Sequence, residues 1–215
     1  MTLTFPMTMP TVGASGLTFE PERVDYLSPE AGGNLGAMTA GFPRWLMKIT
    51  LNAMTFDAAD IWRAWLAIQR GPQRPFFAFD IDRQQPRFHR DGRPYNAKTS
   101  TWSQAMDVND VAVLQLGGLL AGQTVAIGDY IGLTWGTGKW ALTRAVETAR
   151  AGGSGTLAVS AEPPLPPIVP ANATVVLRRA GCMMKLVTAE TKLGEQAIGY
   201  FTSGSTISAA QHLVA

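Results

Sequence analysis

Two aspartates spaced two residues apart are the first place where this sequence could do chemistry. Asp80 and Asp82 stand at the end of an aromatic, alternating stretch that is typical of a strand. Because residues i and i+2 of a strand share a face, the two carboxylates could bind a divalent cation or act as an acid and a base. Three arginines lie within seven residues of Asp80. Charge pairing at the end of a strand is the simpler interpretation, so we expect neither a metal site nor catalysis here.

The segment GTGKW (136–140) has part of the pattern of a phosphate-binding loop. That pattern requires a glycine, four residues, and then Gly-Lys-Ser/Thr. Leu133 occupies the first glycine position and Trp140 the Ser/Thr position, so both requirements fail. The segment instead predicts a β-turn between Trp135 and Trp140.

Thiol catalysis would need a cysteine with a histidine and a third group that orients the histidine. Cys182 lies beside two methionines at the start of an apparent strand, where a buried, inert thiol is the usual state. His89 falls in a basic segment, and His212 lies near the C-terminus. A single cysteine also excludes an internal disulfide and a multi-cysteine metal site. We therefore expect no catalytic residues, no metal and no cofactor.

A basic segment over residues 83–98 carries interleaved aromatic residues and could contact nucleic acid through phosphates and bases. The net charge of +2 and the pI near 8.8 are too mild to favour that partner. A solvated arm, or a subunit contact with the acidic 20–30 segment of a neighbouring copy, is the preferred interpretation, because a head-to-tail interface can use opposite charges on one chain. Direct DNA contact is not expected. The candidate interface residues are Arg83, Arg87, Arg90, Arg93, Glu20 and Glu22.

The elements that must position these residues are mostly strands. Gly (22) and Pro (14) are frequent and charged residues make up only 16%, which indicates many turns and a β-rich chain. Residues 44–52 alternate strictly, as a half-buried strand does. Residues 56–70 form the one convincing helix, with apolar residues at three- and four-residue spacing before a Gly-Pro stop. The loop-rich segment 28–43 predicts a long surface loop.

Short strands with turn signals between them follow from about residue 101 to 180, at intervals that indicate a small barrel or sandwich. Segments 182–189 and 195–204 predict two further strands. Trp102, Trp135 and Trp140 fall at the turns of this region and could stack on sugar rings. No apolar run reaches the 18–20 residues of a membrane span, and the first ten residues lack the features of a cleaved secretory signal. We expect a soluble protein made in a reducing compartment.

The order of these features resembles the distal tail protein family of long-tailed (siphovirus-type) bacteriophages, over about residues 44–214. Two positions depart from the family pattern: Pro166 replaces an arginine, and the neutral region around Gln211 replaces an acidic residue. The matching motifs are structural, not catalytic. They are WRAWLAIQRG (62–71), PFFAFDIDRQQPR (75–87), AGQTVAIGDYIGL (121–133), SAEPPLPPIVPANATVVLRRAGCMMKL (160–186) and FTSGSTISAAQHLV (201–214).

The resemblance implies a mainly β fold with one prominent α-helix. A ring-forming, tail-tube-like β-sandwich (1–97 and 181–215) would hold the helix, and a small OB- or galectin-like β-barrel (98–180) would be inserted into it. The implied function is structural: a non-enzymatic ring of six copies that joins the tail tube to the tail-tip or baseplate hub. Its partners would be its own copies, the tube protein, the hub protein and the tape-measure protein, without a membrane. The chain would be made in the host cytoplasm and end in the virion tail tip. The alternative is a carbohydrate- or host-surface-binding module that uses the 98–180 barrel.

Overall fold

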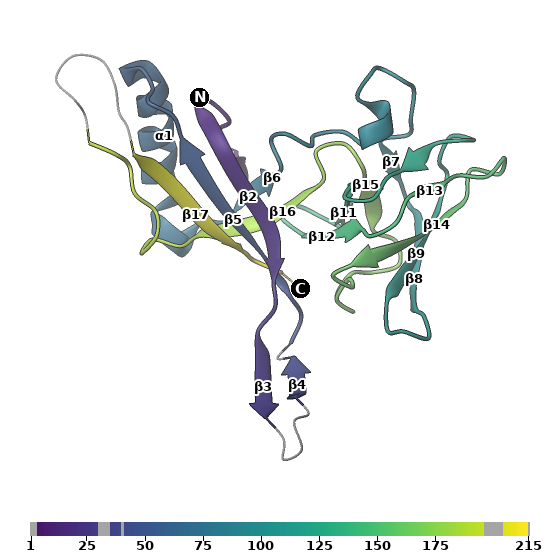
Figure 1. Ribbon diagram of the computed structural model, residues 1–215. Coiled ribbons are helices and arrows are strands. Elements are labelled where there is room, and N and C mark those ends of the chain that lie inside the picture. The colour runs from purple at the N-terminus through teal and green to yellow at the C-terminus, as the bar shows by residue number, and fades with distance from the viewer. Residues whose placement is uncertain (1–3, 30–34, 40, 196–203, 215) are drawn as a thin grey trace.

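The computed structural model describes residues 4–29, 35–39, 41–195 and 204–214. In this part of the chain the fold is mainly β with a single α-helix, α1 (Phe56–Gln69), which confirms the predicted class (Figure 1). Two apolar cores hold it together, one against α1 and one inside the second large sheet. No helix in the described residues is both long and apolar enough to cross a membrane.

A six-stranded sheet draws its strands from both ends of the chain. Its order is β1 (Met7–Thr8), β6 (Phe76–Phe79), β16 (Gly181–Leu186), β17 (Ser205–Gln211), β5 (Arg44–Leu51) and β2 (Ala14–Glu22). Only β1 and β6 run parallel; the other neighbours are antiparallel. The predicted alternation of residues 44–52 is correct, because Trp45, Met47, Ile49 and Leu51 are all buried on one face of β5.

Helix α1 packs against the apolar face of this sheet. Trp62 and Trp65 are buried in the first core, where the Trp65 ring meets Phe76 edge-on at 4.7 Å. The helix ends where Arg70 adopts a left-handed conformation (φ 53°), one residue before Gly71. Ile61 lies outside the buried stripe and is 52% exposed. The second sheet expected of a β-sandwich is not seen in the described part of this unit, where α1 takes that place.

A seven-stranded antiparallel sheet lies beside the first unit (Figure 1). The chain passes from one edge of this sheet to the other through Ser100 alone, so the sheet is strongly curled around its own core. No ladder joins the two edge strands within the described residues, and the predicted barrel is therefore not closed. The order is β7 (Lys98–Thr99), β15 (Thr174–Val176), β11 (Tyr130–Thr134), β12 (Trp140–Ala145), β14 (Leu157–Glu162), β9 (Ala112–Gly117) and β8 (Thr101–Met106).

Two short strand pairs complete the fold. One joins β10 (Thr124–Val125) to β13 (Ala149–Arg150), beside the short helix η2 (Arg87–His89). The other is a hairpin of β3 (Asp25–Pro29) and β4 (Leu35–Thr39). The 3-10 turn η1 (Gly71–Gln73) follows α1.

The hairpin corrects the prediction of a surface loop over residues 28–43. Strands β3 and β4 pair over five residues, and the Thr39 hydroxyl donates to the Asp25 carboxylate at 2.7 Å. Small residues such as Gly36 and Ala37 concealed the strand pattern in the sequence. Residues 30–34 and 40 lie outside the described residues, as does most of the strand predicted over 195–204.

Three aromatic rings fix the two large sheets to each other. The Phe19 and Trp45 rings stack with centroids 5.4 Å apart, and the Tyr130 ring meets both edge-on at 5.7 Å. The Trp45 indole N–H donates to the Leu142 carbonyl at 2.8 Å, and the Tyr130 hydroxyl donates to the Phe19 carbonyl at 3.3 Å. Strands β2 and β5 are thereby held to β11 and β12, which sets the orientation of one unit relative to the other.

Candidate functional site

Three of the four predicted interface arginines converge on one pocket. Arg83, Arg87 and Arg90 line a cavity of about 320 Å³ together with Ile127 and Asp129. We call this cavity the arginine pocket. Its walls come from two segments, the stretch that follows β6 and the turn between β10 and β11.

Arg93 does not reach the arginine pocket. Its guanidinium pairs with the Asp91 carboxylate at 2.9 Å on the exposed surface of the same stretch. The structure therefore separates Arg93 from the other three arginines, although all four lie in one basic segment of the sequence.

The segment that carries these arginines is fixed to the second unit rather than free in solvent. The Asp80 carboxylate accepts the backbone N–H groups of Asp82 and Arg83 at 2.9 and 3.1 Å, which closes a turn directly after β6. Further along, His89 is buried, and its Nε2 accepts the backbone N–H of Thr124 at 3.3 Å. Asp80 thus closes a turn, because its carboxylate accepts hydrogen bonds from two backbone N–H groups. The side chain of Asp82 is exposed.

Asp129 forms the floor of the arginine pocket. One carboxylate oxygen accepts the Arg87 backbone N–H at 2.9 Å, and the other accepts the Ala126 backbone N–H at 2.8 Å. Burial raises the pKa of the Asp129 carboxyl, and these hydrogen bonds and the charges of Arg90 and Arg83 oppose that shift only in part. The carboxylate is therefore held by backbone groups, not by a guanidinium at ion-pair distance.

The predicted acidic partners lie on the first unit. Glu20 pairs with Arg144 of its own chain, at 2.7 Å, across the junction of the two sheets. Glu22 is exposed, at the end of β2. The two side chains therefore differ: Glu20 serves the chain's own fold, and Glu22 remains at the surface.

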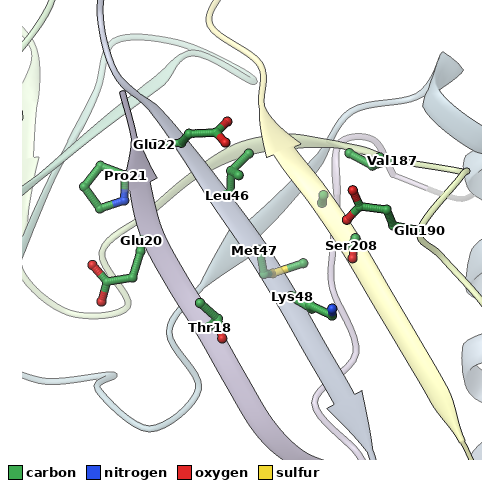
Figure 2. Close-up of a pocket in the computed structure, with 11 residues that line it drawn as sticks. Thr18, Glu20, Pro21, Glu22, Leu46, Met47, Lys48, Val187, Glu190 and Ser208 are labelled. Atoms are coloured by element: carbon green, nitrogen blue, oxygen red, sulfur yellow. The ribbon is translucent and has the colours of Figure 1, made fainter. Parts of the chain in front are cut away.

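A groove of about 570 Å³ runs over the outer face of the six-stranded sheet (Figure 2). Glu20 and Glu22 border it on β2, and Glu190 borders it beyond β17, with Lys48 of β5 between them. We call this region the acidic groove, because three carboxylates face one ammonium group. It offers a surface for a partner, without an imidazole or thiol that could act in catalysis.

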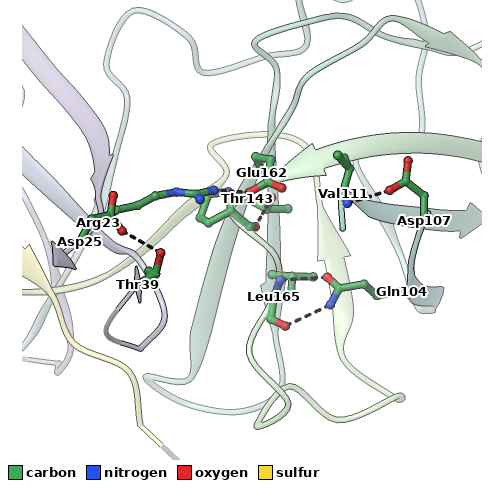
Figure 3. A network of polar contacts seen from close by, with 10 residues as sticks. Arg23, Asp25, Thr39, Gln104, Asp107, Val111, Thr143, Glu162 and Leu165 are labelled. Atoms are coloured by element: carbon green, nitrogen blue, oxygen red, sulfur yellow. Dashed lines mark hydrogen bonds and ion pairs between the residues drawn. The ribbon is translucent and has the colours of Figure 1, made fainter. Parts of the chain in front are cut away.

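The β3–β4 hairpin projects from the body of the molecule (Figure 1). Tyr26, Leu27 and Met38 on it are 61%, 62% and 69% exposed, although all three are large and apolar. At its base, Arg23 reaches across to Glu162 of β14 at 2.8 Å (Figure 3). Apolar side chains are therefore held out in solvent on an arm whose base is tied to the second unit.

Two of the three predicted sugar-stacking tryptophans share a depression. Trp135 and Trp140 line a shallow cavity of about 560 Å³ with Asn172 and several threonines. Trp140 also packs on Phe77 of β6, with ring centroids 4.5 Å apart. Trp102 lies elsewhere, in β8, where it packs against the second core with its indole nitrogen buried and unpartnered within the described residues.

The remaining reactive side chains are not brought together. Cys182 is fully buried in β16, and burial raises the pKa of its thiol far above the usual range. The described residues contain no group of three or more His, Cys, Asp or Glu side chains that could hold a metal ion. Residues 135–139 form the turn between β11 and β12, and Trp140 begins β12, in agreement with the predicted turn between Trp135 and Trp140.

Sequence reasoning missed the two features that depend on position in space. The exposed hairpin was hidden in a run of small residues, so the pairing of Tyr26 with Met38 could not be predicted from the sequence. Arg23 and Glu162 are 139 residues apart, so no local sequence pattern predicts their ion pair. Comparison with known proteins adds no assignment, because neither a family model nor a curated protein matches the chain.

Proposed function

We propose that this chain is a structural protein that assembles with copies of itself, as a ring in the tail tip of a long-tailed bacteriophage. The single observation that carries self-assembly is the projecting β3–β4 hairpin with its exposed apolar side chains. The order of motifs over residues 44–214 supports the placement in a phage tail.

An isolated two-stranded hairpin is marginally stable in water. Exposed contiguous apolar surface on a protein marks a site of interaction. Tyr26 and Met38 are register partners on β3 and β4, so their side chains share one face of the hairpin. A neighbouring copy that covers this face buries both side chains and stabilises the hairpin.

Two further features of the first unit fit a second copy as the partner. Within the described residues, the nine-residue strand β2 forms a ladder only with β5, so it is an edge strand of its sheet. Such edges invite pairing with another chain.

The acidic groove and the arginine-rich stretch lie on different units of one chain, and opposite charges on two faces favour a head-to-tail contact. The contact of Glu22 with the arginines of a neighbour stays a prediction.

In the proposed assembly, six copies form a ring that joins the tail tube to the tail-tip or baseplate hub. The tube protein, the hub protein and the tape-measure protein are its neighbours, and the chain has no enzymatic part in it. The aromatic junction of Phe19, Trp45 and Tyr130 supports this role, because a ring subunit must hold its two units at one fixed angle.

The assembly is tested by the mass of the purified full chain in solution, measured by light scattering after size exclusion. We expect a species of about six times the 23.0 kDa chain mass. The double variant Tyr26→Ser/Met38→Ser should shift the protein to lower mass while its circular dichroism is unchanged. Val108→Ser is the matched control, because Val108 is 99% exposed on a different turn and should leave the mass unchanged. A wild-type monomer at high concentration contradicts the proposal.

A second candidate function is carbohydrate binding at the tail tip. It is favoured by the depression where Trp135 and Trp140 lie with Asn172, since an aromatic platform beside an amide suits a sugar ring. Binding to host cell-wall glycans, lost on Trp135→Ala and weakened on Asn172→Ala but kept in Leu120→Ser on a distant turn, supports this function. Absence of binding to the host envelope removes it.

A further inference from the structure

The arginine pocket carries more positive charge than the side chains that line it neutralise. Arg83, Arg87 and Arg90 bring three positive charges to one cavity, and Asp129 brings the single negative charge that lines it. Within the described residues, no carboxylate lies at ion-pair distance from any of the three guanidiniums, whereas Arg93 nearby is paired. The pocket therefore has an excess of two positive charges.

Within the described residues, two of the three guanidiniums donate a hydrogen bond, in each case to a backbone carbonyl. Arg83 Nη1 donates to the Gly128 carbonyl at 3.2 Å, and Arg90 Nη2 donates to the Asp82 carbonyl at 3.2 Å. Each guanidinium offers five N–H donors. Most of the donors around the pocket are thus available to a ligand.

The backbone beneath the pocket is built to allow this arrangement. Gly128 has φ +85°, and a Cβ atom there would lie 2.9 Å from Arg83 Nη1. A side chain at this position would push the guanidinium away, so glycine permits its close approach. The hydrogen bonds of Asp129 to the Arg87 and Ala126 backbone fix the two walls to each other. The Arg83 and Arg90 guanidiniums are therefore positioned before a ligand arrives, which lowers the entropic cost of binding.

We propose that the arginine pocket binds the phosphate group of a small ligand, with Arg83, Arg87 and Arg90 as its donors. A phosphate monoester carries close to two negative charges at neutral pH and presents three acceptor oxygens. That charge matches the excess in the pocket, and guanidinium forks suit phosphate geometry. The cavity of about 320 Å³ is larger than a bare phosphate ion needs, and Ile127, 58% exposed, offers an apolar contact to the rest of the ligand. The phosphate site would use the same arginines as the proposed head-to-tail contact, and the test below separates the two roles.

The test is calorimetric titration of the full chain at constant ionic strength near neutral pH. Inorganic phosphate is the first probe and glycerol phosphate, a monoester, is the second. We expect saturable binding of both. Arg87→Gln or Arg83→Gln should weaken the affinity by roughly tenfold or more, the effect of losing one charge-assisted hydrogen bond. Arg93→Gln is the matched control from the same segment and should change the affinity by less than about twofold, since an exposed pair contributes little.

Three results overturn the proposal. The first is no saturable binding of either phosphate probe. The second is an equal loss in Arg93→Gln and Arg87→Gln, which indicates diffuse charge attraction. The third is a change of assembly mass in Arg87→Gln with phosphate binding intact, which makes the pocket a subunit contact. A monomeric chain that binds phosphate supports this inference and contradicts only the assembly.

Discussion

Replacing Trp45 with phenylalanine tests whether the aromatic junction, and not the ion pairs around it, holds the two sheets together. The change removes the indole N–H that donates to the Leu142 carbonyl at 2.8 Å. Leu142 is only 3% exposed, so its carbonyl would be left buried without this donor. An unsatisfied buried polar group costs about 1–3 kcal/mol. The space left by the smaller ring adds about 1 kcal/mol. We therefore expect Trp45→Phe to lower the free energy of unfolding by about 2–4 kcal/mol.

The comparison variant is Glu20→Gln, which breaks the ion pair with Arg144 at the same junction. The Glu20 side chain is 55% exposed, and water screens a pair of this kind. Exposed ion pairs contribute about 0–1 kcal/mol. The assay is equilibrium urea unfolding followed by far-UV circular dichroism, with the midpoint and slope compared between the two variants and the wild type.

Two outcomes would refute this reasoning. If Glu20→Gln lowers the free energy of unfolding as much as Trp45→Phe does, the ion pair stabilises the junction as strongly as the buried indole. The argument that the buried contact contributes more than the exposed one is then wrong. If Trp45→Phe costs less than about 0.5 kcal/mol, the Leu142 carbonyl has found another donor and the indole hydrogen bond is dispensable.

Three further perturbations have defined outcomes. Thr143→Val removes a fully buried hydroxyl that donates to the Pro163 carbonyl at 2.7 Å, and it should cost about 1–3 kcal/mol in urea unfolding; a neutral result contradicts the hydrogen bond. Tyr95→Phe should leave the melting temperature unchanged or raise it, because the buried hydroxyl has no partner in the described part of the chain, and a clear loss would reveal one. Burial and the charge of Lys185 lower the pKa of His212, so the folded state favours the neutral imidazole. Stability should therefore fall as the pH drops below the unfolded value of about 6.5, and urea midpoints of His212→Gln should show a smaller fall.

The elements that could be predicted from the sequence are those that rest on local periodicity. The helix was expected over 56–70 and is found over Phe56–Gln69, because its apolar spacing and the following Gly-Pro both act within a few residues. Strand β5 was predicted from alternation in the same way. The 28–43 prediction failed because small residues carry little periodic signal, so the pairing of β3 with β4 was not visible.

Clustering of the arginines in space was decided only by the tertiary structure. Arg87 and Asp129 are 42 residues apart, and Glu20 and Arg144 are 124 apart. The charge of each side chain is known from the amino acids alone, but its neighbours are not, because they follow from how the sheets pack. For this reason the amino acids alone determined a mainly β chain with one helix and a basic stretch. The fold decided that three arginines share a pocket, that Glu20 is used within its own chain, and that an apolar hairpin stands in solvent.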